Sequence, residues 1–68
     1  MKLQFYADEW EEFIRNCGFT DAELEVVALL RRGWYSIDIA EEINVSKRTV
    51  DRLRKRITQK ITRYLLRG

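Results

Sequence analysis

Residues 36–56 read SIDIAEEINVSKRTVDRLRKR, and this stretch decides the fold that we predict. It predicts a short helix with Ser36 as its N-cap, a break at Asn44, and then a second, basic helix that Ser46 caps. Ala40 supplies the small side chain that is needed where two helices cross closely. Asn44 tolerates the left-handed backbone conformation of a tight turn. Two helices joined in this way form the helix-turn-helix motif.

Apolar residues at helical spacing are expected to hold the two helices of this motif together. In the short helix, Ile39 and Ile43 make one side of a small wedge of core. The other side comes from three residues at and after the turn, namely Val45, Val50 and Leu53.

A further helix is expected from Asp8 to Cys17, because Asp8 and Glu11 have the spacing of a capping box. Trp10 and Phe13 lie on its apolar face, so we expect both in the core.

Another helix is expected to begin at Thr20, which forms a capping box with Glu23, and to end at Gly33. The last helix is expected from Lys47 to about Leu66, with one apolar stripe along its whole length. The predicted fold class is therefore all-α: a small bundle of about four helices that contains a helix-turn-helix, with a long C-terminal helix.

Charge is distributed unevenly along the chain. Residues 1–45 hold four basic and ten acidic side chains, whereas residues 46–68 hold nine basic side chains and one acid, Asp51. This asymmetry favours a side that faces a polyanion. A second interpretation stays open, in which the basic helix neutralises the acidic part of the protein.

Composition excludes several classes of protein. One cysteine, Cys17, and no histidine leave neither an internal disulfide nor a structural zinc site. The chain has no carboxylate pair, Cys/His pair or glycine-rich phosphate loop, so we expect no enzyme, no cofactor and no metal. We see no signal peptide or membrane span, and a free thiol favours a cytoplasmic protein.

Residues 19–61, FTDAELEVVALLRRGWYSIDIAEEINVSKRTVDRLRKRITQKI, resemble the DNA-binding domain of LuxR-type regulators. No gap is needed to match that family's pattern, and region 4 of sigma factors is a close second. The matching residues are Phe19, Thr20, Glu23, Val26, Val27, Leu29, Gly33, Ile39, Ala40, Ile43, Ser46, Thr49, Val50, Ile57 and Lys60.

The resemblance implies a small transcription regulator that binds double-stranded DNA sequence-specifically. The helix that starts at Ser46 would read the major groove. We expect Lys47, Arg48 and the amides of the first turn to face phosphates, with a hydroxyl contact from Thr49 and a phosphate anchor at Arg56.

By the same resemblance, Asp51, Arg52 and Lys55 occupy the positions that face bases. Arg52 or Lys55 would donate to guanine O6 and N7, and Asp51 would accept from cytosine N4. The remaining basic residues of this helix other than Lys60 are expected to be solvated: Arg54, Arg63 and Arg67.

The chain also departs from the family pattern. After Lys60 it lacks the family's fourth helix, which commonly forms the homodimer contact, and residues 62–68 instead extend the last helix. Residues 1–18 add a helix in front. That helix either fills the vacant packing site or makes a dimer contact of its own.

We thus expect one domain, residues 1–68, that forms a homodimer through the N-terminal helix or through Tyr64, Leu65 and Leu66. The alternative is a protein-interaction module with little affinity for DNA. It would bind RNA polymerase or a sigma factor through the acidic helix 8–17. Trp34 and Tyr35, in the loop before the short helix, are expected to be partly buried.

Overall fold

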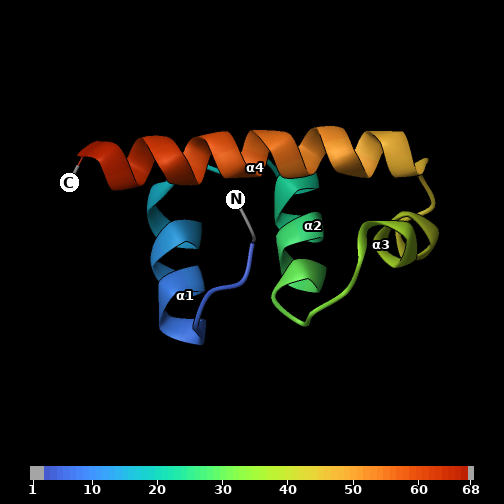
Figure 1. Ribbon diagram of the computed structural model, residues 1–68, viewed down its shortest axis with the longest axis horizontal. Coiled ribbons are helices and arrows are strands. Elements are labelled where there is room, and N and C mark those ends of the chain that lie inside the picture. Colours follow the sequence, from blue (N-terminus) through green and yellow to red (C-terminus); the bar gives the residue numbers. More distant parts are fainter. Residues whose placement is uncertain (1–2, 68) are drawn as a thin grey trace.

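Figure 1 shows a computed structural model of the protein, which describes residues 3–67. The described chain forms four helices: α1 (Ala7–Asn16), α2 (Asp21–Leu30), α3 (Ser36–Glu42) and α4 (Lys47–Arg67). The long helix α4 runs across one side of the molecule, and the three shorter helices lie beneath it. The predicted all-α fold with a long C-terminal helix is confirmed.

Three local signals act as predicted. The amide of Thr20 donates to Glu23 Oε1 (2.9 Å) and the amide of Glu23 donates to Thr20 Oγ1 (3.2 Å), which completes the capping box of α2. Asn44 is left-handed, with φ of 59°. Ser46 caps α4, since its Oγ accepts from the amide of Thr49 at 3.2 Å.

Two predicted caps are wrong. Helix α1 begins at Ala7, because the amide of Tyr6 donates to Glu9 Oε1 (2.9 Å), so the Asp8–Glu11 box does not form. Ser36 is the first residue inside α3 rather than its N-cap. Its hydroxyl accepts a hydrogen bond from Arg54 instead (2.6 Å).

The core lies between α4 and the other helices. Val26, Ile39, Val50, Ile57 and Ile61 have no measurable exposure, and Trp10 and Phe13 are buried as predicted. The other buried apolar residues are Leu3, Val27, Leu30 and Ala40.

Some predicted core positions differ in the structure. Val45 is 39% exposed, so Val50 and the half-buried Leu53 hold the motif together without it. Tyr35 is also exposed, and only Trp34 of that pair is partly buried.

Helix α1 covers the C-terminal half of α4 with its apolar face. The Phe13 ring packs edge-on against Tyr64 (centroids 6.1 Å apart), and the Tyr64 hydroxyl donates to Glu12 Oε2 (2.6 Å). Phe5, from the segment before α1, packs edge-on against Trp10. The apolar face of α1 is therefore buried within the protein.

Among residues 3–67, each of the helices α1 to α4 is too short or too polar to cross a membrane.

Candidate nucleic-acid interface

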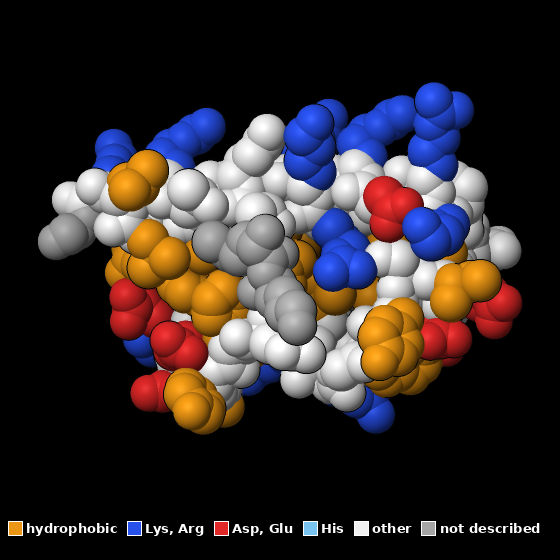
Figure 2. Space-filling view, in the orientation of Figure 1, with side chains coloured by type: hydrophobic (Ala, Val, Ile, Leu, Met, Phe, Trp, Pro, Cys, Tyr) orange, Lys and Arg blue, Asp and Glu red, His pale blue; other side chains and the backbone are white. Residues whose placement is uncertain are grey.

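Four basic side chains form a stripe on the outer side of α4: Arg48, Arg52, Lys55 and Arg56, called here the basic stripe. All four are exposed. Residues spaced by three, four, seven and eight positions share one side of an α-helix, so the four charges lie side by side. Figure 2 shows basic side chains along the upper edge of the molecule, where α4 runs.

The opposite side of α4 fixes the direction of this stripe. Val50, Ile57 and Ile61 are fully buried against the other helices. Rotating α4 about its axis would expose these three side chains, at a cost of about 1.5–3 kcal/mol each. The basic side chains are thus held outward by the core.

The charge of the basic stripe is not neutralised within the described part of the chain. The ion pairs found in that part of the chain are Arg31–Glu11, Lys47–Asp51 and Lys60–Glu23, and none of them includes a residue of the stripe. Only the last joins the basic segment to the acidic part of the sequence. The interpretation that α4 neutralises the acidic half therefore accounts for Lys60 and not for the stripe.

The start of α4 presents free backbone donors. Ser46 Oγ accepts from the amide of Thr49 and lies 3.0 Å from Thr49 Oγ1, so these two hydroxyls are engaged with each other. Over residues 3–67, the turn and cap hydrogen bonds involve neither the Lys47 nor the Arg48 amide. Helix N-termini with free amides favour anions such as phosphate.

Lys47 and Asp51 form an exposed pair one turn apart, with Nζ 2.8 Å from Oδ2. The hydrogen bond from Lys47 lowers the pKa of Asp51, and Ser36 and Arg54 lower it further. Asp51 therefore stays ionised and can only accept hydrogen bonds. The pair lies beside the basic stripe.

A known protein family matches most of this sequence. The model of bacterial regulatory proteins of the luxR family matches residues 18–63, which include α2, α3 and most of α4. The chain belongs to the LuxR family. No curated protein and no solved structure matches it. LuxR-family domains are DNA-binding regulatory domains with a helix-turn-helix, so α3 and α4 are that motif here and the protein is a DNA-binding regulator.

Two basic residues of this LuxR-family domain have structural contacts that sequence reasoning missed. Arg54, expected to be solvated, is half-buried and donates to Ser36 Oγ, which ties α4 to the start of α3. Lys60, matched to the family without a role, lies 2.5 Å from Glu23 Oε1 and donates to the carbonyl of Gly18 (3.1 Å). A buried carboxylate such as Glu23 indicates that a basic partner lies nearby, but its burial could be seen only in the folded structure.

The structure also places the two surfaces considered for dimer formation. The apolar face of α1 is buried and Tyr64 is half-buried against it. Leu65 and Leu66 remain 51% and 83% exposed.

Proposed function

We propose that this LuxR-family domain is a cytoplasmic transcription regulator that binds double-stranded DNA sequence-specifically, with the N-terminal half of α4 in the major groove. One observation carries the proposal. The basic stripe is exposed, forms no ion pair within residues 3–67 and is held outward by a buried face on the same helix. The major groove of B-DNA is wide enough to admit one α-helix.

Phosphates would be held at both edges of this helix. The free amides of Lys47 and Arg48 and the Arg48 side chain suit one phosphate at the start of α4, and Thr49 can add its hydroxyl. Arg56, two turns further along, is the phosphate anchor at the other edge of the stripe. Such contacts position the protein without reading sequence.

Base edges would be read by Arg52, Lys55 and Asp51. Arg52 and Lys55 are exposed and suit guanine O6 and N7, whereas the ionised Asp51 suits the amino group of cytosine. Lys47 contacts one oxygen of the Asp51 carboxylate, Oδ2, so Asp51 can accept from cytosine while Lys47 stays in place or turns to a phosphate. The Lys47–Asp51 pair is therefore part of the reading surface.

We further propose a homodimer whose contact lies at Leu65 and Leu66. These two leucines are exposed at the end of α4, while the apolar face of α1 is already buried. A dimer would require half-sites about one helical turn apart, or a multiple of that.

Fluorescence anisotropy tests the DNA proposal. A labelled random-sequence duplex of about three helical turns is titrated with protein at low and at physiological salt. The variant Arg48→Ala/Arg56→Ala, which removes two of the proposed phosphate contacts, is compared with Arg15→Ala/Arg67→Ala, which removes the same charge from exposed positions off the stripe.

We expect affinity that falls steeply with salt. Removing two contacts should flatten the slope of log K against log salt by up to about 2, because each phosphate contact contributes about 0.9. The control variant should keep nearly the full slope. No binding at low salt, or equal losses in both variants, would overturn the proposal.

The alternative of a polymerase-binding module using the acidic helix has less support. Glu11 of α1 pairs with Arg31 (3.0 Å), and Glu12 accepts from Tyr64. These contacts hold α1 to its neighbours and engage two of its carboxylates. The similarity to sigma factor region 4 stays a prediction.

A further inference from the structure

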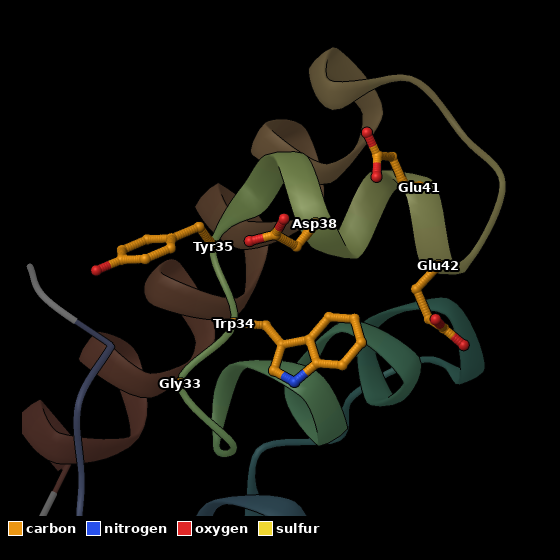
Figure 3. A pocket seen from close by; sticks show the side chains of 6 residues that line it. All are labelled: Gly33, Trp34, Tyr35, Asp38, Glu41 and Glu42. Carbon is orange, nitrogen blue, oxygen red and sulfur yellow. The ribbon is translucent and has the colours of Figure 1, made fainter.

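A groove of about 570 Å³ runs along α3 and the loop before it. Its lining consists of Gly33, Trp34, Tyr35, Asp38, Glu41 and Glu42. In Figure 3 the Trp34 indole lies alongside α3, between the Tyr35 side chain at one end and Glu42 at the other. Helix α3 contacts the rest of the protein through Ser36, Ile39 and Ala40, which are buried on another side of the helix.

The aromatic residues of this groove are available to a ligand. Tyr35 is 76% exposed, whereas Trp34 is partly buried, so the Tyr35 ring is the more accessible of the two. The guanidinium of Arg32 lies 6.0 Å from the centroid of the Trp34 ring. This distance is that of a cation–π contact, so the indole already attracts one cation at the edge of the groove.

The charged residues of the groove point to the same kind of ligand. Asp38, Glu41 and Glu42 are exposed, and in the described chain none of them forms an ion pair or a side-chain hydrogen bond. Three unpaired carboxylates repel a nucleic acid and attract cations. They are set beside two aromatic rings that also attract cations.

We propose that this groove docks a basic segment of a partner protein, with arginine or lysine side chains against Trp34 and Tyr35 and in ion pairs with the three carboxylates. Charge complementarity singles out this occupant. A neutral apolar segment would leave the carboxylates desolvated without partners, and an acidic segment would be repelled.

The groove and the basic stripe lie on different helices and carry opposite charge. The stripe lies on the outer side of α4, and α3 turns its buried residues to the core and its acidic residues away from them.

A defined peptide tests this docking site in the absence of DNA. The probe is a fluorescein-labelled octapeptide of alternating arginine and leucine, and its control replaces each arginine with glutamate. Binding is measured by anisotropy in 150 mM salt, about the physiological ionic strength. The indole resonances of Trp34 and Trp10 are followed by NMR in parallel.

The test variant is Asp38→Asn/Glu41→Gln/Glu42→Gln. The matched control, Asp8→Asn/Asp21→Asn/Glu25→Gln, removes the same charge from exposed positions outside the groove. All of these positions are exposed, so circular dichroism should show both variants folded.

We expect the arginine peptide to bind and to shift the Trp34 resonance but not that of the buried Trp10. Its affinity should fall at least tenfold in the groove variant and less than twofold in the control. Tyr35→Ala should also weaken binding. Absence of binding, or equal loss in both triple variants, would overturn the docking site.

DNA affinity separates this inference from the proposed function. The groove variant should bind the random duplex at least as tightly as the unmodified protein, since it loses only negative charge away from the stripe. A protein that binds the peptide and not DNA would contradict the proposed function and keep the docking site.

Discussion

Replacing Lys60 with methionine tests the packing of α4 on α2. Glu23 is 1% exposed, and its carboxylate accepts hydrogen bonds from Lys60 and from the amide of Thr20. Lys60→Met keeps most of the aliphatic stem and removes the charge. The buried carboxylate then loses its counterion, while the capping box remains.

The expected cost follows from the burial of this pair. Breaking a buried ion pair by removing one partner costs about 3–5 kcal/mol, because the other charge is left uncompensated. The Lys60 side chain is 26% exposed, so water reaches the site and the lower end, about 3 kcal/mol, applies. For a domain of this size that corresponds to a fall in Tm of about 12–24 °C.

The pH dependence gives a second readout. Burial acts to raise the pKa of Glu23, but the hydrogen bonds from Lys60 and Thr20 outweigh it and lower the pKa. A lowered pKa contributes stability above the ordinary pKa of glutamate, and this is lost as pH falls through the folded-state value. Without Lys60, the hydrogen bond that contributes most to lowering the pKa is lost, so the pKa of Glu23 rises relative to that in the unmodified protein. The difference in stability between the two proteins should therefore shrink between pH 7 and about pH 4.

Urea unfolding followed by circular dichroism measures these effects. Arg63→Met is the matched control, since Arg63 is exposed on the same helix and should change the free energy of unfolding by less than about 0.5 kcal/mol. In a Glu23→Gln background, Lys60→Met should lower the free energy of unfolding far less, because no buried charge is left without a counterion. Equal effects of Lys60→Met and Arg63→Met, or a difference that grows as pH falls, would refute the reasoning.

Three further predictions concern the turn, the reading surface and the dimer. Asn44→Val should destabilise the protein by about 1–2 kcal/mol because a β-branched residue tolerates φ of 59° poorly, whereas Asn44→Gly should be nearly neutral in the same unfolding assay. Asp51→Asn should release Lys47 and strengthen binding to random duplex DNA in the anisotropy assay; weaker binding would show that the pair is needed intact. Leu66→Lys should shift the protein to monomer in sedimentation velocity with the helical signal unchanged, and a dimer that survives would place the contact elsewhere.

The signals that predicted the fold act over three or four residues. The Thr20–Glu23 box, the left-handed Asn44 and the Ser46 cap each depend on neighbours in the chain, so their spacing was enough to place the breaks between helices. The start of α1 was predicted wrongly from the spacing of Asp8 and Glu11. In the structure Glu9 accepts from the amide of Tyr6, and Phe5, just before Tyr6, packs against Trp10.

The helical period likewise predicted that the basic stripe and the buried stripe lie on opposite sides of α4, because both are properties of one helix. The helical period did not show which basic side chains of α4 lack a partner within the protein. Arg54 meets Ser36 from 18 positions away, and Lys60 meets Glu23 from 37. The sequence by itself therefore determined the helices, the helix-turn-helix and the charged face. The tertiary structure alone decided which charges are engaged, because partners so far apart along the chain meet only when the core brings the helices together.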